Sequence, residues 1–318
     1  MQRKRVLKVN LEGKIKSFDD MTESFILFKR AQGISERTIR DYNSTFKAFK
    51  NLSNITEFKI ADVKECLLQF FSKKSQNAPA TYNIPYSNLN AFFNWAINEG
   101  YIDENPIKAL GLRKKRDEGR IRHIEEDVIR KLLEAIDLTT YAGLRDYVTV
   151  ILTLDTGIRP KEVFSLRISD IDFTHNLLTI RKEIAKTRAT RILPLSPQTI
   201  EVIKKLISVK LPEWEDYVLH TNEGLPMSID RWEKRMKNYS KIINHKIAPY
   251  DLRHTFAIMF LRNNGNVFAL QHELGHTDIT MTKRYVRLAQ SDIKEQHSIA
   301  SPVNVFVKRT TRIQKLFK

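Results

Sequence analysis

The amino-acid sequence predicts a mainly α-helical fold of two domains, with one small β-hairpin or sheet in the second domain. Three observations support this prediction. Apolar residues recur at spacings of three, four and seven over residues 21–105, this periodicity is lost over 106–123, and a short stretch rich in Leu, Ile and Thr interrupts the helical patterns further along. A chain of 318 residues is long enough for two domains, each with its own core.

The segment 21–105 has the pattern of four amphipathic helices. Gly33 and the sequence Asn77, Ala78, Pro79 separate helical stretches, and Ser35 has the character of a helix start. One face of each helix is apolar, formed by Phe25, Phe28, Ile39, Tyr42, Phe46, Phe49, Leu67, Phe70, Phe71, Leu89, Phe92, Phe93 and Ala96. We therefore expect a compact four-helix domain, preceded by a basic extension at 1–20.

The rest of the chain is predicted to be a basic linker at 106–123, a second domain at 124–297 and a basic tail at 298–318. In the second domain, two strands at 177–183 and 190–195 flank a basic hairpin tip at 185–189. Helical patterns surround this hairpin at 127–138, 145–155, 161–166, 198–209, 228–243, 250–263, 267–274 and 279–288. Glycines at 157, 265 and 275 separate several of them.

The charge balance indicates a polyanionic partner. The chain has 54 Lys and Arg against 37 Asp and Glu, a net charge of +17, which favours nucleic acid over a membrane surface. Residues 1–20 lack the apolar core of a signal peptide, and no run approaches the roughly 18 apolar residues of a membrane helix. Cys66 is the one cysteine, which fits a cytoplasmic protein and excludes an internal disulfide; we expect it to be buried.

Seven basic residues are candidates for contact with DNA. They lie on the expected helical domain, in the linker and around the hairpin tip, where a cationic side chain can neutralise a backbone phosphate. These candidates are Arg37, Arg40, Lys114, Lys115, Arg116, Arg188 and Arg191.

Four short segments in the second domain carry a more specific signal. They are TGIRPKEV at 156–163, YDLRHTFA at 250–257, LGH at 274–276 and TKRYV at 282–286. In this order, and after a helical domain of this size, they resemble the tyrosine recombinase, or phage integrase, family. The resemblance covers nearly the whole chain and implies an amino-terminal core-binding domain and a carboxy-terminal catalytic domain that close around DNA as a clamp.

The resemblance also implies which residues are catalytic. The two family arginines fall on Arg159 and Arg253, and the late histidine on His276. The nucleophile falls on Tyr285, and the hairpin lysine on Lys186, with Lys182 as the alternative. The family pattern His-x-x-Arg has one departure, because Tyr250 stands three residues before Arg253. A tyrosine donates a hydrogen bond but titrates near about pH 10, so it is a poorer base at neutral pH.

These residue types suit phosphodiester chemistry. Two guanidinium groups can hold the non-bridging oxygens without losing charge, and a phenol can form a reversible phosphotyrosine bond with the 3′ phosphate. Lys186 would protonate the departing 5′ oxygen, and His276 would donate a hydrogen bond to the phosphoryl group. No metal or other cofactor is expected. We expect Glu162 to orient or neutralise Arg159, and His254 to face elsewhere with a structural role.

The sequence leaves several readings of function open. A DNA strand-exchange enzyme leads, and a catalytically silent DNA-binding regulator, such as a repressor, is the alternative suggested by Tyr250. A metal-dependent nuclease would need clustered carboxylates, of which we find no convincing set. The expected partner is double-stranded DNA, with assembly as a dimer or tetramer on DNA, docking of the apolar and basic tail on a neighbouring protomer, and DNA-bending accessory proteins.

Overall fold

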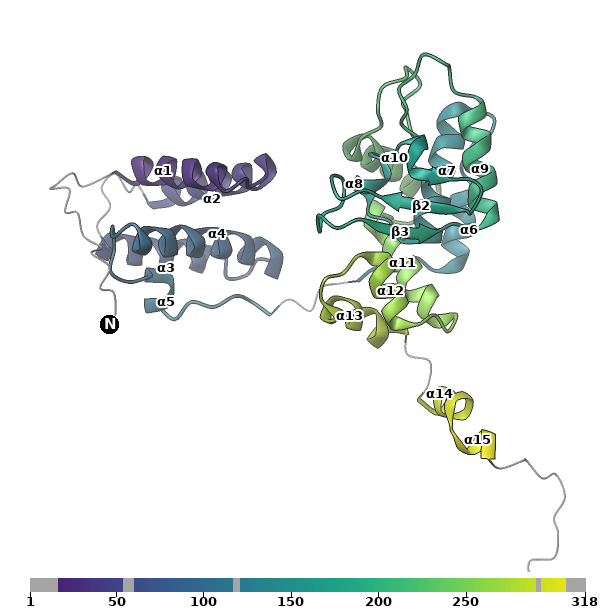
Figure 1. The fold of residues 1–318 in the computed structure, drawn as a ribbon. Helices are drawn as coiled ribbons and strands as arrows, with labels where there is room; N and C mark the ends of the chain where they lie inside the picture. Colours follow the sequence, from purple (N-terminus) through teal and green to yellow (C-terminus); the bar gives the residue numbers. More distant parts are fainter. Residues whose placement is uncertain (1–16, 54–59, 117–120, 290–292, 307–318) are drawn as a thin grey trace, which may run out of the picture. The chain divides into compact units, whose positions relative to one another are not determined.

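A computed structural model describes residues 17–53, 60–116, 121–289 and 293–306. The chain divides into two compact units, Met1–Gly119 and Arg120–Lys318. Both units are mainly helical and the second contains a small sheet (Figure 1), so the predicted fold class is confirmed. Most of the predicted extension, residues 117–120 of the predicted linker, and residues 307–318 of the predicted tail lie outside the described residues.

The first unit begins earlier than predicted. Ser17 caps the first helix: its hydroxyl accepts a hydrogen bond from the Asp20 backbone N–H at 3.1 Å, and the Asp20 carboxylate accepts one from the Ser17 N–H at 3.2 Å. Phe18, only 1% exposed, packs against Phe46 and Phe92 in the core. The extension predicted at 1–20 therefore ends too late. The helices of this unit are α1 (Phe18–Ala31), α2 (Glu36–Ser53), α3 (Ile60–Lys73), α4 (Pro79–Asn98) and α5 (Pro106–Ala109).

An aromatic cluster holds the first unit together. Phe25 meets Phe46 and Phe92 edge to face, with ring centroids 5.8 and 5.6 Å apart. Such pairs contribute beyond the burial of their area, by about 0.5–1.5 kcal/mol each. Cys66 is buried in the same core, as predicted.

The predicted linker at 106–123 begins too early. Ile107 in α5 is fully buried, and Leu110 and Leu112 pack against the same core. The Lys115 ammonium donates to the backbone carbonyl oxygens of Ser75 and Asn77, the latter at 2.8 Å. The basic residues of this stretch predict a linker, but charge density alone does not show whether the apolar residues between them pack in a core.

The second unit combines the sheet with ten described helices and a short 3-10 turn. Its strands pair antiparallel in the order β1-β2-β3, and Leu178 faces Leu193 across the β2–β3 pair. The elements are α6 (Glu126–Glu134), α7 (Tyr141–Thr156), α8 (Pro160–Val163), η1 (Ile168–Asp170), β1 (Ile171–Asp172), β2 (Leu177–Ile180), β3 (Arg191–Pro194), α9 (Pro197–Ser208), α10 (Ile229–Ile242), α11 (Pro249–Arg262), α12 (Val267–Leu274), α13 (Ile279–Ala289), with α14 (Ile293–Ala300) and α15 (Val303–Phe306) following.

The hairpin strands are shorter than predicted. β2 ends at Ile180, because the chain then turns: the N–H groups of Ile184 and Ala185 donate to the Arg181 carbonyl oxygen at 3.1 and 3.0 Å. Residues 181–190 therefore form a connection with turns between β2 and β3. β1, of two residues, was not predicted, since so short a strand carries no periodicity.

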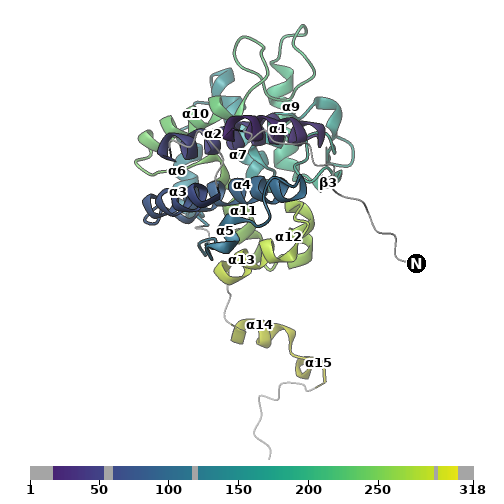
Figure 2. The same ribbon diagram turned by 90° about the vertical axis from the view of Figure 1, so that its left-hand side faces the viewer.

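Helices α11, α12 and α13 lie together in both views of the chain (Figures 1 and 2) and share a small core. Gly157, at the end of α7, has a φ of +60° and would bring an added Cβ within 2.3 Å of the Phe256 ring. Close packing of α7 on α11 thus needs glycine here. None of the described helices is both long enough and apolar enough to span a membrane.

Candidate active site

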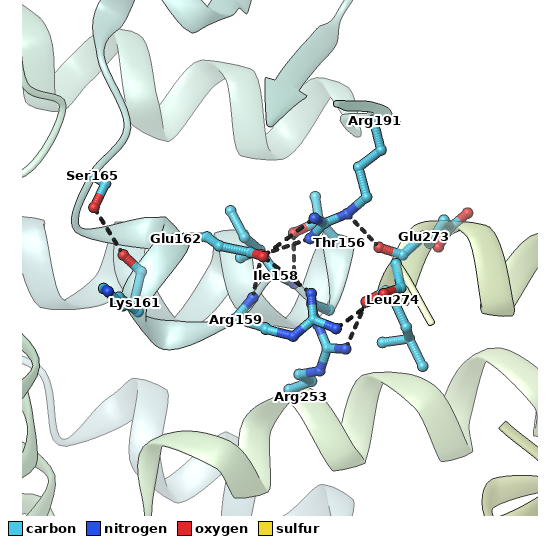
Figure 3. A network of polar contacts seen from close by, with 12 residues as sticks. Thr156, Ile158, Arg159, Lys161, Glu162, Ser165, Arg191, Arg253, Glu273 and Leu274 are labelled. Atoms are coloured by element: carbon cyan, nitrogen blue, oxygen red, sulfur yellow. Dashed lines mark hydrogen bonds and ion pairs between the residues drawn. The ribbon is translucent and has the colours of Figure 1, made fainter. Parts of the chain in front are cut away.

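A buried carboxylate joins two arginines from different elements. Arg159 precedes α8, and its guanidinium donates to the Glu162 carboxylate at 3.0 Å while its backbone N–H donates to the other oxygen at 3.1 Å. Arg191, at the start of β3, donates to the same carboxylate at 2.6 and 3.3 Å. Glu162 is 1% exposed. One carboxylate therefore fixes two guanidinium groups, as Figure 3 shows.

The end of α12 holds three arginines through consecutive backbone carbonyl oxygens. Glu273 accepts from Arg191 at 3.0 Å and Leu274 from Arg253 at 2.8 Å (Figure 3). Gly275 accepts from Arg159 at 3.1 Å. The last carbonyls of a helix have no intrahelical partner and carry the negative end of its dipole. The helix terminus is thus a natural site for cations.

Arg253 comes from α11 and is 3% exposed. Besides Leu274, it donates to the Gly157 carbonyl oxygen at 2.5 Å and lies 3.3 Å from Nε2 of His276. Its contacts fix the guanidinium in one orientation without neutralising its charge.

The network carries excess positive charge. Burial, and next the charge of Arg159, lower the pKa of Arg253 to about 9. Burial alone would raise the pKa of Glu162, but its bonds to Arg191 and the charges of Arg191 and Arg159 outweigh it and hold that pKa below its usual value. An ionised Glu162 beside three guanidiniums leaves a net positive site, which is suited to an anion.

His276 and Tyr285 complete the cluster from the loop after α12 and from α13. Their rings are stacked with centroids 6.3 Å apart and an angle of 6° between planes. Nδ1 of His276 lies 2.9 Å from the Thr282 hydroxyl. Burial, followed by the charges of Arg253 and Arg159, lowers the pKa of His276 to about 4, so the ring is neutral near pH 7.

Tyr285 is 5% exposed. Burial raises the pKa of its phenol, against the opposing charges of Arg253, Arg284 and Arg159. Its hydroxyl lies 2.8 Å from Nδ1 of His254. The structure therefore contradicts our expectation that His254 faces away: α13 crosses α11 so that position 254, as well as 253, borders the cluster.

The structure brings four of the six predicted catalytic residues together: Arg159, Arg253, His276 and Tyr285. Lys186 is exposed in the β2–β3 connection, and its side chain makes no hydrogen bond or ion pair to the part of the chain that the structure describes. Tyr250, in the first turn of α11, is 49% exposed, and its side chain likewise makes no such bond to a described residue.

Two of the residues predicted to contact DNA, Arg191 and Lys115, instead form bonds within the protein. Arg191 is 6% exposed and bound to Glu162, so the prediction that it contacts DNA at the surface is wrong. The Lys115 ammonium donates to the backbone carbonyl oxygens of Ser75 and Asn77. Arg191 shares one face of β3 with the buried Leu193, an alternation that could have revealed its burial. The other candidates, Arg37, Arg40, Lys114, Arg116 and Arg188, are exposed.

The arrangement can bind a phosphate-sized anion beside a phenol. Guanidiniums held by backbone oxygens and Glu162 are organised before any ligand arrives, which is how fixed charge stabilises a developing anion. Among the described residues, no group of three or more His, Cys, Asp or Glu side chains is placed to hold a metal ion.

Comparison with known proteins agrees with this geometry. The model of the Phage integrase family matches residues 122–292, and that of the Phage integrase SAM-like domain matches 17–116. Tyrosine recombinase XerD of Listeria monocytogenes is 25% identical over 299 residues, covering 89% of this chain and 99% of that protein. A tyrosine recombinase of Thermosipho africanus is 28% identical over 269 residues, covering 81% and 91%.

Solved structures share the fold. The Tn1549 transposon integrase, in complex with a circular intermediate DNA, has a TM-score of 0.69 at 19% identity and covers 88% of this chain and 98% of that one. A lambda integrase dimer bound to a core site has a TM-score of 0.70 at 18% identity, covering 87% and 79%. Since the family model spans more than half of the sequence, the chain belongs to the phage integrase family of tyrosine recombinases.

Proposed function

We propose that this chain is a site-specific DNA recombinase that cuts and rejoins double-stranded DNA through a 3′-phosphotyrosine bond at Tyr285. The observation that carries the proposal is the convergence of Arg159, Arg253, His276 and Tyr285 from separate elements in one buried, positively charged cluster. The relatives are named tyrosine recombinases, and the structural neighbours include integrases solved with DNA.

The proposed chemistry begins with capture of the scissile phosphate. Arg159 and Arg253 would bind its non-bridging oxygens, and His276 would add a hydrogen bond as negative charge develops. Because hydrogen bonds already hold both guanidiniums in place, little of the free energy of DNA binding is needed to order them. Arg191 would act indirectly, by sharing the Glu162 carboxylate that orients Arg159.

Strand cleavage would follow by attack of the Tyr285 oxygen on phosphorus. The P–O5′ bond breaks, and Lys186 would protonate the 5′ oxygen. Lys186 is exposed in the connection between β2 and β3, and we propose that this segment brings it to the phosphate when DNA binds. Attack by a 5′ hydroxyl on the phosphotyrosine then rejoins the strands, so bond energy is conserved.

Surface charge supports DNA as the partner. Arg37 and Arg40 are exposed on α2 of the first unit, Lys114 follows α5, and Arg188 is exposed beside Lys186. We propose that these side chains contact backbone phosphates, which position a protein on DNA without reading its sequence.

The regulator alternative rests on Tyr250 replacing a family histidine. Nothing in the comparisons favours it, since the named relatives are recombinases. The remaining cluster is also intact around Tyr285. A catalytically silent protein would bind the same DNA without forming a covalent bond.

A nicked suicide substrate tests the proposal directly. With a nick beside the scissile phosphate the short 5′ fragment diffuses away, so the wild-type chain should accumulate as an adduct that resists denaturation. Tyr285→Phe, which keeps the ring but removes the nucleophile, should form no adduct while binding the same DNA. Binding without any adduct from the wild-type chain would favour the regulator.

The tail is the proposed contact for assembly on DNA. Val305 and Phe306 in α15 are 81% and 82% exposed, an unusual extent for apolar side chains. We propose that this tail docks on a neighbouring protomer in a dimer or tetramer, with or without DNA-bending accessory proteins. Truncation after Ala300 should lower the cooperativity of binding to a two-site DNA, measured by mobility shift, but leave single-site affinity within about twofold. Unchanged cooperativity would contradict docking.

A further inference from the structure

We propose that His254 is the base that accepts the Tyr285 proton when the phenol oxygen attacks phosphorus. This inference rests on the proposed function and adds a residue to it. It also changes the significance of Tyr250, because the nucleophile then needs no base at that position.

The geometry of α11 and α13 carries the inference. Nδ1 of His254 lies 2.8 Å from the Tyr285 hydroxyl, a normal hydrogen-bond distance, and the two ring centroids are 5.7 Å apart. Both groups lie where α11 packs on α13, and Tyr285 is almost fully buried. The contact is therefore held by the packing of two helices rather than by mobile side chains.

The other aromatic and imidazole groups near the nucleophile are less suited to this role. Neither ring nitrogen of His276 contacts the Tyr285 hydroxyl, because Nδ1 lies at Thr282 and Nε2 at Arg253. Tyr250 is half exposed, and its phenol makes no hydrogen bond to a residue that the structure describes. Among the described side chains, His254 is thus the one in hydrogen-bond contact with the Tyr285 oxygen.

The surroundings of His254 keep it neutral before DNA binds. Burial, and then the charges of Arg253 on α11 and Arg284 on α13, lower its pKa to about 4. A neutral imidazole can leave Nδ1 unprotonated and so accept the phenol proton. His276, after α12, and Tyr285 are the other titratable groups around it. A phosphate bound to Arg253 would offset the cationic field and favour the imidazolium as it forms.

The step balances in protons and electron pairs. The Tyr285 oxygen forms a bond to phosphorus and passes its proton to Nδ1 of His254, while the P–O5′ bond breaks and the 5′ oxygen takes a proton from Lys186. In rejoining, the 5′ hydroxyl returns its proton to Lys186, and the departing phenolate recovers its proton from His254. The protein ends each cycle in its starting state.

Cleavage kinetics of His254→Gln test the proposal, with His272→Gln as the matched control because His272 is exposed on α12. On the suicide substrate at pH 7, we expect His254→Gln to be slower by about 10²–10⁴-fold, the usual range for a general base, and the control to be unchanged. A 5′-bridging phosphorothiolate, whose thiolate departs without an acid, should rescue Lys186→Ala but not His254→Gln.

A more acidic nucleophile separates proton transfer from a structural role. Fluorotyrosine placed at position 285 should raise the cleavage rate of His254→Gln at least tenfold, because its phenol loses the proton more readily. For the same reason, the difference in rate between His254→Gln and wild type should shrink as pH rises. A defect of equal size at every pH, with no recovery by fluorotyrosine, would overturn the proposal. A His254→Gln protein that cleaves at the wild-type rate, in an assay where the wild-type chain forms the adduct, would also overturn it.

The fluorine resonance of the same protein reports the contact without any activity. His254→Gln should shift this resonance relative to wild type, because it replaces the imidazole that contacts the Tyr285 hydroxyl, whereas His272→Gln should not. An unchanged resonance would overturn the hydrogen bond itself. A wild-type chain that forms no adduct would instead remove the proposed function, and the two failures are therefore distinguishable.

Discussion

Replacing Glu162 with alanine should destabilise the second unit by about 3–5 kcal/mol and abolish adduct formation. Removing one partner of a buried ion pair leaves the other charge buried and unpaired, which costs that much. Here the loss would leave two guanidiniums, those of Arg159 and Arg191, without their shared carboxylate. Urea unfolding would measure the change in the free energy of unfolding, and the suicide substrate would measure the activity.

Matched variants make the Glu162 result interpretable. Glu201→Ala, at an exposed position of α9, should change the free energy of unfolding by no more than about 0.5 kcal/mol. Adding Arg191→Met to Glu162→Met should recover part of the stability, because apolar side chains can fill a site that no longer holds an ion pair. A Glu162→Ala protein within about 1 kcal/mol of wild type would show that water already reaches this carboxylate.

Helix positions were predictable where local signals mark both ends. α12 has the predicted bounds, because the Asn266 side chain caps its first turn and Gly275, with a φ of +59°, closes its last. α5 was missed because Ile107 and its apolar neighbours lie among basic residues. Periodicity needs about two turns of helix to be visible, so a four-residue element gives no such signal.

The candidate site was predictable in its motif residues and unpredictable in its contacts. Arg159, Arg253, His276 and Tyr285 follow from four segments in order, whereas the bond between His254 and Tyr285 depends on how α13 crosses α11. Arg191 illustrates the same limit. A positive charge in a sequence indicates an anionic partner, but the packing of the strand decides whether that partner is DNA or Glu162.

Acid should weaken the second unit well before its carboxylates are fully protonated. Burial first, and then neighbouring cations, lower the pKa of His220, His254 and His276 to about 4, below the usual value of about 6.5. Between these values the unfolded chain binds protons that the folded chain does not, so stability is full above about pH 6.5 and falls as pH drops toward 4. Each histidine contributes up to about 1.4 kcal/mol per pH unit in that interval.

Two acidic groups act in the opposite direction, and burial raises the pKa of both: Asp251 and Glu273. Burial, and next the charge of Asp155, raise the pKa of Glu273 to about 6. The folded chain therefore binds that proton more readily than the unfolded chain as pH falls below about 6, which offsets part of the loss. Three histidines against these two carboxyl groups still leave a net decrease in stability.

His220 allows the acid effect to be isolated from catalysis. It is fully buried beside Trp214, and neither ring nitrogen has a hydrogen-bond partner among the described residues. His220→Phe keeps an aromatic ring in this position, so the variant should fold and still form the adduct. The number of protons that it takes up on unfolding in acid, which sets the slope of stability against pH, should be about one smaller than in wild type. Urea midpoints at pH 7.5, 6 and 5 would measure this slope. A variant with the wild-type slope would show that the pKa of His220 is the same in the folded and unfolded chains. A wild type whose midpoint does not change between pH 7.5 and 5 would contradict the depressed pKa values of all three histidines.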